Sequence, residues 1–489
     1  RRLRCGVDGA RALGWTAPAP RLKMEETDSV VRLDNPRLNK SRLLCMSLSF
    51  LGLYIFFLIL GAEGPAPLAT FESEGSNDVL FDPDTGTYQY ILRVGVVSKE
   101  SQFLWLWSRM TPPPVPDGAE PAIDDVETTL TFTLQVFGTG SDGESHTIVD
   151  GEDIARDITC RSGEEFCEWF RLWSEDFVAY DEYRLFVTIQ EPEAWEEAAG
   201  DTVLPDAAPF TMQSSGLYMN ADYTRMEMGW KYTFLVVTLL FMFVPRCGYA
   251  PRLRRLARPQ RTFMQRWVLA LLWGLVFFND PFFALTVYTG LRPFLAGLHV
   301  LFAAVFMFLL LTFWLCLFSD TRHMARGSDR PRRHGLCWFW LPKLLLTGLI
   351  FVTVLSSYMY YRYHKTVSPE YSGVDDDKER AALFAAFLGL LMAAYLVWSL
   401  VLVFGTCGGL RAVPLPYRFL LGATLLAWLV GVIGVFSAAF YPYRTDSLTF
   451  LGFYALMNTY VWTLAYGYTP VFTGDKHGAE DEGGDFQGA

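Results

Sequence analysis

Apolar residues form eight runs along the chain, each long enough to cross a bilayer. The first run covers residues 43–62 and contains no charged side chain. After a polar segment at 63–222, seven more runs occupy residues 230–244, 267–288, 294–318, 336–361, 381–404, 419–440 and 448–468. A helix needs about 20 apolar residues to span the hydrocarbon core of a membrane. The pattern therefore predicts a multi-pass α-helical membrane protein, with one N-terminal span at 43–62 and a seven-helix transmembrane bundle at 223–470.

Short segments of the polar region have the pattern of β-strands. Residues 88–97 and 128–137 are rich in β-branched and aromatic residues, and residues 183–190 (YRLFVTIQ) alternate between polar and apolar side chains. Such alternation is typical of a strand with one buried face. Prolines at 112–114 and glycines within 138–143 separate these segments. We expect residues 63–222 to form an all-β sandwich between the first and second spans.

The sign of the charged residues changes from one polar segment to the next. Residues 63–222 contain 32 Asp and Glu against 7 Lys and Arg. The segments at 245–266 and 319–343 are rich in arginine, and the first of them has no acidic residue. Lysine and arginine resist translocation across a membrane. The sequence thus predicts that the sandwich is luminal or extracellular and that both termini are cytoplasmic.

The two ends of the chain have compositions unlike the rest. Residues 1–42 are expected to form a disordered cytoplasmic N-terminus; Met24 is a plausible start, so residues 1–23 are set aside. Residues 471–489 are acidic and rich in glycine, and we expect a cytoplasmic tail within reach of sorting adaptors. The first span is either a retained anchor or a cleaved signal peptide. Its apolar stretch exceeds the about 7–15 residues of a usual signal core, which favours retention.

Cys160 and Cys167 are the only cysteines within 63–222. In an oxidising lumen such a pair is expected to form a disulfide that closes a short loop, the alternative being two free thiols. Because the loop is short, the stabilisation should lie at the low end of about 2–4 kcal/mol.

Asn279 and Asp280 are polar residues inside the third apolar run. A carboxylate in the middle of a span costs at least about 2.5–3.5 kcal/mol on insertion scales, and Pro281 removes a backbone donor and favours a kink. These side chains could accept a polar head group, act in a proton-linked switch, or hold helices together. In the last interpretation they pair with polar groups of another helix, with Asn458 and Tyr460 as candidates, so the four residues form the candidate intramembrane site.

A basic cluster follows the second span and consists of Arg252, Arg254, Arg255, Arg258 and Arg261. Such a cluster fixes orientation and attracts anionic cytoplasmic lipids, with each residue contributing about 1 kcal/mol. The arginines are not interleaved with an aromatic platform, so nucleic acid is not an expected partner.

Four strings in the membrane part resemble a known family. They are FNDPFF at 278–283, FWLC at 313–316, LPK at 341–343 and FYALMNTY at 453–460. Together with the order of parts, they are similar to the transmembrane protein 181 branch of the GOLD-domain seven-transmembrane family, which contains Wntless. The resemblance implies a GOLD-like sandwich over the mouth of a seven-helix bundle.

The resemblance also implies a function. Members look like cargo receptors or trafficking chaperones that carry secreted or lipid-modified proteins between Golgi, endosome and plasma membrane. The expected partners are then membrane lipids and secreted protein cargo with its acyl chain, and in this branch foreign toxins. The alternatives are a signalling receptor of the G-protein-coupled type and a transporter or channel that uses Asp280.

Catalysis is not expected from the sequence. The six histidines are scattered and form no metal-binding pair at i, i+4, and neither a nucleophile elbow nor a dinucleotide fingerprint occurs. We expect no enzyme activity, metal or cofactor. The composition, 51% apolar and 19% charged, agrees with a membrane protein, since soluble proteins carry about 25% charged residues.

Overall fold

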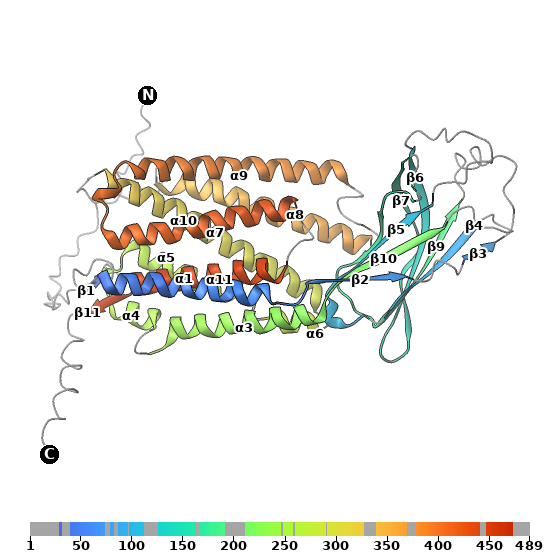
Figure 1. The fold of residues 1–489 in the computed structure, drawn as a ribbon, viewed down its shortest axis with the longest axis horizontal. Coiled ribbons are helices and arrows are strands. Elements are labelled where there is room, and N and C mark those ends of the chain that lie inside the picture. Colours follow the sequence, from blue (N-terminus) through green and yellow to red (C-terminus); the bar gives the residue numbers. More distant parts are fainter. Residues whose placement is uncertain are drawn as a thin grey trace, which may run out of the picture.

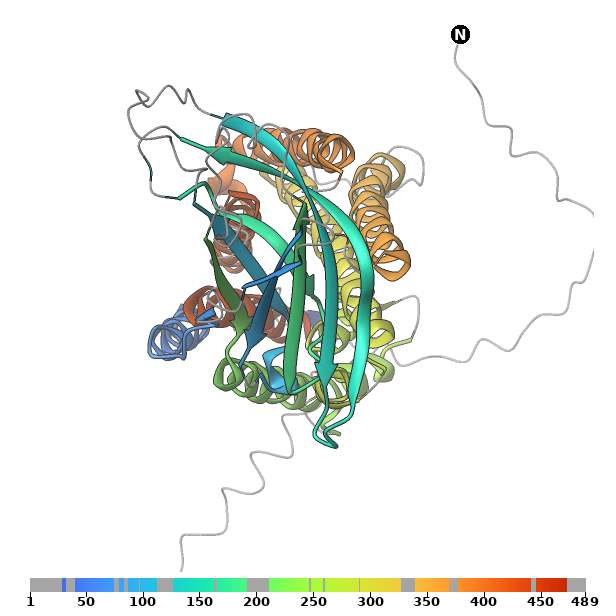
Figure 2. The same cartoon turned by 90° about the vertical axis from the view of Figure 1, so that its right-hand side faces the viewer.

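The protein has two parts that follow one another along a single axis, a bundle of helices and a pair of β-sheets at one end of it (Figure 1). The computed structural model describes residues 29–31, 40–73, 79–82, 87–95, 97–111, 126–161, 164, 166–190, 211–245, 248–257, 260–289, 291–326, 339–368, 371, 377–440 and 446–472. The sheets cover the end of the bundle when the molecule is viewed along the helices (Figure 2).

The sheet part is an antiparallel sandwich inserted between the first and second long helices. Its strands are β2 (Leu68–Ser73), β3 (Val79–Asp82), β4 (Thr87–Val94), β5 (Leu104–Met110), β6 (Val126–Thr139), β7 (Ser145–Cys160), β8 (Phe170–Glu175), β9 (Glu182–Gln190) and β10 (Met212–Met219). One sheet has the order β2-β10-β5-β8 and the other β3-β4-β9-β6-β7. A one-turn helix, η3 (Lys99–Ser101), precedes β5. The expected all-β sandwich is confirmed.

The sandwich is held by the alternating side chains of its strands. In β4, Tyr88, Tyr90, Leu92 and Val94 are buried, while the residues between them are half-buried or exposed. β5 repeats this period of two. Because successive side chains of a strand point to opposite faces, one face of each sheet supplies the core. Within the sandwich, the buried hydroxyls of Ser108 and Ser214 form a hydrogen bond of 2.7 Å.

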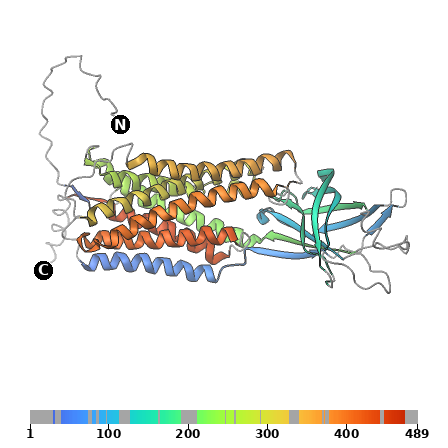
Figure 3. The ribbon, with the colours of Figure 1, turned by 90° about the horizontal axis from the view of Figure 1, so that it is seen from above.

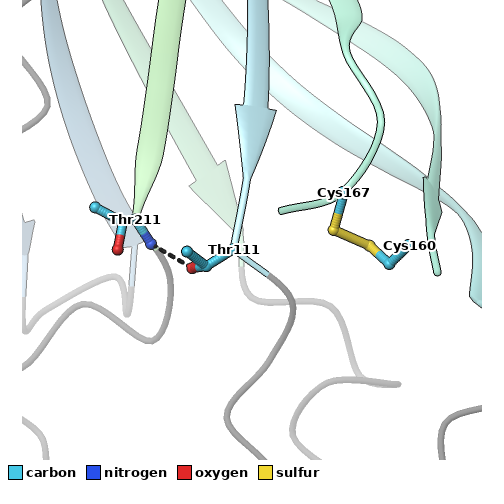
Figure 4. The surroundings of a disulfide bond; sticks show 4 residues. All are labelled: Thr111, Cys160, Cys167 and Thr211. Atoms are coloured by element: carbon cyan, nitrogen blue, oxygen red, sulfur yellow. Dashed lines mark hydrogen bonds between the residues drawn. A yellow bond between two sulfur atoms is a disulfide. The ribbon is translucent and has the colours of Figure 1, made fainter. Parts of the chain in front are cut away.

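Cys160 and Cys167 form a disulfide in the structure, with their Cα atoms 4.1 Å apart (Figure 4). Cys160 ends β7 in the five-stranded sheet, whereas Cys167 precedes β8 in the four-stranded sheet. The backbone N–H of Cys167 also donates to the carbonyl of Met110 at the end of β5 (2.8 Å). The disulfide therefore links the two sheets at one edge of the sandwich. Nearby, the N–H of Thr211 donates to the hydroxyl of Thr111 (2.8 Å).

The helical part consists of long helices that run side by side (Figure 3). The long helices are α1 (Lys40–Ala62), α3 (Ala221–Phe243), α5 (Phe263–Phe278), α7 (Arg292–Ala325), α8 (Leu341–Val367), α9 (Lys378–Cys407), α10 (Leu415–Phe440) and α11 (Ser447–Tyr468). Three short helices, α4 (Tyr249–Arg255), α6 (Phe283–Tyr288) and η7 (Leu410–Ala412), join them. After the sheets the chain thus forms the expected seven-helix bundle, in which α5 and α6 together make one member.

Seven helices of the described chain are long and apolar enough to cross a membrane: α1, α3, α5 with α6, α7, α8, α9 and α10. The eighth long helix, α11, is not among these seven and lies inside the bundle in contact with α1, α3, α5 and α10. Most of its residues are buried, including Asn458 and Tyr460. Its polar side chains therefore face other helices, where hydrogen-bond partners are available.

α1 packs closely on α11. A Cβ atom placed on Gly61 would come within 2.8 Å of the Cα of Leu448, and one on Gly452 within 2.8 Å of the side chain of Leu58. Glycine at helix contacts allows backbones to approach closely inside a membrane. At the end of the bundle away from the sheets, β1 (Ser29–Val31) pairs with β11 (Pro470–Phe472). The segments that flank the first and last long helices consequently lie at the same end.

Candidate functional site

The polar centre of the bundle is built around a break between α5 and α6. α5 ends at Phe278, Asn279 caps it, and α6 begins at Phe283. Asp280 has a φ of 51°, in the left-handed region where Asn and Asp are the best tolerated residues after glycine. The sequence led us to expect a kinked helix with the polar pair near its middle. The structure instead has a full interruption, which lies in the half of the span nearer the sheets.

Asn279 pairs with the last helix through its side-chain amide. Its Nδ2 donates to Oδ1 of Asn458 (2.9 Å), and Nδ2 of Asn458 donates back to Oδ1 of Asn279 (3.0 Å). Thr238 of α3 lies beside this pair and receives a hydrogen bond from the indole N–H of Trp462 (3.1 Å). The four side chains join α3, α5 and α11. Because both amides are fully buried, each needs the other to satisfy its donors and acceptors.

Asp280 faces a different set of groups, so the expectation that it pairs with Asn458 or Tyr460 is wrong. Its Oδ2 lies 3.9 Å from Nζ of Lys231 on α3 and 3.0 Å from Nδ1 of His299 on α7. The ammonium of Lys231 also binds Oε1 of Glu227 one turn earlier (2.8 Å) and lies over the ring of Phe283. We call Glu227, Lys231, Asp280 and His299 the charged cluster. Asp280 is thus a member of a network of charged side chains from α3 and α7.

The charged side chains of this network are largely shielded from solvent. Lys231 and Asp280 are each 2% exposed, and the Glu227 side chain is 13% exposed. Removing charges from water costs several kcal/mol per ion, which only close opposite charges and hydrogen bonds offset. Charged residues inside a membrane commonly face the bundle interior and mark functional positions. The sequence contained one signal for this site, the i, i+4 pair Glu227 and Lys231, but Glu227 lies just before the apolar run at 230–244.

Tyr460 belongs to a separate contact between helices. Its hydroxyl accepts from the indole N–H of Trp314 on α7 (3.2 Å) and bonds the hydroxyl of Thr424 on α10 (2.9 Å). All three side chains are buried. These bonds satisfy polar atoms and tie α7, α10 and α11 together, which is the role expected of polar side chains between membrane helices.

Through η3, the sheets are attached to the helices that carry or adjoin the charged cluster. Oε1 of Glu100 accepts from the hydroxyl of Tyr288 at the end of α6 (2.8 Å), and its Oε2 lies 2.7 Å from the guanidinium of Arg225 on α3. The hydroxyl of Thr224 donates to the carbonyl of Glu100 (2.7 Å). At the start of α7, the buried Arg292 donates to the carbonyls of Val178 in the sandwich and Val287 in α6. α3, α6 and α7 therefore all take part in attaching the sheets to the bundle.

A second attachment connects the sheets with α8 and α9. Asp176 accepts from the hydroxyl of Tyr361 (3.0 Å) and from Arg362 (2.8 Å) on α8. Lys378 at the start of α9 donates to Asp157 of β7 (2.6 Å), and this hydrogen bond lowers the pKa of the Asp157 carboxyl. Beside them, burial raises the pKa of Glu175 at the end of β8.

A cavity of about 550 Å³ opens between this second attachment and the edge of the sandwich. It combines aromatic side chains with charges of both signs, and its lining includes Trp107, Arg156, Asp157, Trp169, Arg171, Tyr371 and Lys378. The guanidinium of Arg171 lies over the ring of Trp107, 5.3 Å from its centroid. Arg156 donates to the carbonyl of Arg171, so β7 and β8 are joined at the cavity wall (2.9 Å). The cavity can therefore take both polar and aromatic groups.

A more apolar groove of about 340 Å³ runs between α8 and α9. It is lined by Thr353, Ser357, Tyr360, Tyr361, Tyr371, Asp377, Ala381, Phe384, Ala385 and Leu388. Tyr371 lines both this groove and the cavity under the sheets. A polar space at the sheet junction thus adjoins an apolar space between two membrane helices. The sequence did not indicate this relationship, because Tyr371 lies in a connecting segment with no pattern of its own.

The expected basic cluster lies at the opposite end of the bundle. Arg252, Arg254 and Arg255 are on α4, whose Tyr249, Ala250 and Leu253 are buried. Arg261 donates to the carbonyl of Leu256 (3.2 Å), and Arg258 lies outside the described residues. α4 thus buries one face against the bundle and carries arginines at its end.

The comparisons with known proteins agree with this architecture. The family model described as Wntless-like, transmembrane domain, matches residues 220–472, about half of the chain. Over 363 aligned residues the chain is 26% identical to human Transmembrane protein 181. The aligned region covers 71% of this chain and 70% of that protein. The matched region begins just before α3 and ends with β11, so it contains the charged cluster and the groove between α8 and α9. The chain belongs to the Wntless-like transmembrane family.

Proposed function

We propose that this protein is a cargo receptor or trafficking chaperone of the secretory pathway, which binds secreted proteins at the junction of its sheets and helices. The observation that carries the proposal is the shared wall at Tyr371, where the polar cavity under the sheets adjoins the apolar groove between α8 and α9. A protein segment that bears both polar residues and an apolar group, such as an acyl chain, matches this pair of spaces.

The distribution of charge supports an orientation for this role. The sandwich lies in the strongly acidic segment, and α4, at the other end of the bundle, is basic. Because arginine-rich connections remain in the cytoplasm, the sheets would face the lumen or the cell exterior, and β1 and β11 would lie on the cytoplasmic side. Cargo would then meet the cavity in the Golgi, in endosomes or at the plasma membrane, and sorting adaptors would meet the opposite face.

Site-specific crosslinking in cells tests the proposal. A photoreactive residue at Ser368, which lines the cavity, should capture secreted proteins, whereas the same residue at His146 near the far tip of the β6–β7 hairpin should not. Trp169→Ala and Leu388→Trp would alter the cavity and the groove, respectively. We expect both to reduce capture about tenfold, because the loss of one aromatic contact or the blocking of a pocket changes binding by about 1–3 kcal/mol.

The matched control is Trp273→Ala, since Trp273 is an exposed aromatic of α5 away from both spaces. Equal capture from Ser368 and His146, or unchanged capture in both pocket variants, would overturn the proposal. Guanine-nucleotide exchange stimulated on a cytoplasmic partner would favour a signalling receptor instead.

A further inference from the structure

The positive and negative charges of the charged cluster do not cancel when His299 is neutral. Glu227 and Asp280 are acidic and Lys231 is basic, while the fourth member, His299, is charged only when it holds a proton. With His299 neutral the four side chains carry a net charge of minus one, and one added proton makes the set neutral. A buried net charge is costly where water cannot solvate it, so the gain or loss of one proton changes how strongly these side chains hold together.

The geometry gives this proton a position and a route. Nδ1 of His299 lies 3.0 Å from Oδ2 of Asp280, within ion-pair distance though not aligned as a hydrogen bond, so a protonated imidazole lies directly beside the buried carboxylate. Asp280 is almost completely buried, whereas the side chain of His299 is 30% exposed. The imidazole therefore lies between the buried carboxylate and the outside of the bundle. A proton would arrive at the imidazole and form an N–H bond there, with no other reactant required.

The cluster is linked mechanically to the sheets on two sides. Asp280 lies where α5 gives way to α6, and Tyr288 at the other end of α6 binds Glu100 of the sandwich (2.8 Å). α3 carries Glu227 and Lys231, and its Arg225 binds the same Glu100 (2.7 Å). Between these ends, the hydroxyl of Tyr232 on α3 accepts from the N–H of Ala284 on α6 (3.0 Å). A change in the attraction between α3 and Asp280 is therefore transmitted to η3.

We propose that Asp280 and His299 form an intramembrane proton-binding site, and that the bound proton sets how firmly α3 and α6 hold the sheets. With the proton bound, the neutral cluster keeps α6 close to α3. Without it, the uncompensated carboxylates of Asp280 and Glu227 repel one another and loosen α6 together with its hold on Glu100. The proposal concerns the coupling of protonation to the junction and does not depend on the identity of any cargo.

The neighbouring titratable groups are consistent with this assignment. α3 contributes Glu227 and Lys231, with Tyr223 and Tyr232 on either side, and α11 contributes Tyr454, whose ring centroid lies 5.8 Å from Nζ of Lys231. From α7 the cluster receives His299, and from α6 the ring of Phe283. His299 is the one histidine among these described groups, and histidine is the residue type used in proteins as a switch near neutral pH.

Hydrogen–deuterium exchange on the full chain in lipid nanodiscs tests the proposal without any ligand. Exchange is measured at about pH 6 and about pH 8, on either side of ordinary histidine titration, and corrected for intrinsic amide rates. In the wild type, peptides covering residues 99–102 and 283–289 should exchange about tenfold faster at the higher pH, since opening then breaks a weaker charge-assisted contact. Peptides from β4 in the sandwich core should not change.

Three variants sharpen this test. His299→Gln retains a polar side chain that cannot take up the proton, and Asp280→Asn removes the charge that holds it, so both should abolish the pH difference. His323→Gln, at the far end of the same helix, and His364→Gln, at the second attachment, should both retain it. Wild-type exchange that is the same at both pH values would overturn the proposal. So would a pH difference that persists in His299→Gln, or one that disappears in His364→Gln. If neither cluster variant folds, the wild type and the two control histidines still decide between these outcomes.

Discussion

Asn279 and Asn458, 179 residues apart in the sequence, donate a hydrogen bond to each other from side-chain amides that are fully buried. The pair joins the end of α5 to the middle of α11 at the level where the charged cluster begins. Each amide satisfies the other, which is why two asparagines are tolerated where water is absent. The same contact fixes the rotation of α11, so it also places Tyr454 beside Lys231.

The amide pair should behave as one energetic unit. Asn458→Leu removes both mutual hydrogen bonds and takes away the donor that Asn458 supplies to the buried Oδ1 of Asn279, which should cost about 1–3 kcal/mol. The double replacement by leucine should cost less than the sum of the single changes, with a coupling of about 0.6–1.7 kcal/mol. Thermal unfolding of the four proteins in detergent measures the coupling. Strict additivity of the two single changes would contradict a direct pair.

Lys231 should be the most sensitive position of the charged cluster. Lys231→Met leaves Glu227 and Asp280 buried without their cation, and breaking a buried ion pair from one side costs about 3–5 kcal/mol. The control is Lys378→Gln, because the ion pair between Lys378 and Asp157 is exposed and worth at most about 1 kcal/mol. Melting temperatures in nanodiscs should therefore fall far more for the first variant. Similar losses in both would rule out burial as the cause.

Glu175 should give the sandwich a dependence on pH. Burial raises the pKa of its carboxyl from the ordinary value of 4.5, despite the hydrogen bond from the N–H of Phe177 and the nearby Lys365. The folded state then binds this proton more tightly than the unfolded chain, so the contribution of Glu175 to stability is complete below the unfolded pKa and is lost as the pH rises through the raised value.

Glu175→Gln imitates the protonated side chain and tests this sign. We expect the variant to melt higher than the wild type at neutral pH, and the two melting temperatures to converge as the pH falls below 4.5. Glu182→Gln, at a more exposed carboxylate of β9, should leave the difference between acidic and neutral pH unchanged. A lower melting temperature of Glu175→Gln at neutral pH would mean that the attraction of Lys365 outweighs burial.

The disulfide should contribute a modest share of the sandwich stability. The bridged cysteines are seven residues apart, so the loop that they close is short, and replacing both by serine should cost about 2 kcal/mol. Cys407→Ser, at an exposed free cysteine, is the control and should have no effect. Unfolding of the purified protein with and without reductant measures the difference. An equal response of wild type and double variant to reductant would show that no such bond forms.

The sequence by itself indicated the long apolar helices and the strands near 88–97, 128–137 and 183–190. Both follow from local periodicity, because a span needs a long apolar run and a half-buried strand needs alternation. The runs at 267–288 and 294–318 correspond to α5 with α6 and to α7, and the alternating residues 183–190 to β9. Asn458 could be named as a candidate partner of Asn279 because polar groups inside spans must find one another.

Only the tertiary structure decided which side chains contact the polar residues inside the spans. The contacts of Asp280 with Lys231 and His299 bring together three helices, and no local pattern specifies which faces of those helices meet. Asp280 has a left-handed backbone, and its carboxylate lies beside Lys231 of α3 and His299 of α7, a placement that one sequence position cannot reveal. Likewise, Tyr371 lines both the cavity and the groove only because the sheets rest on α8 and α9. Periodicity fixes burial along one element, whereas a site is made where several elements pack.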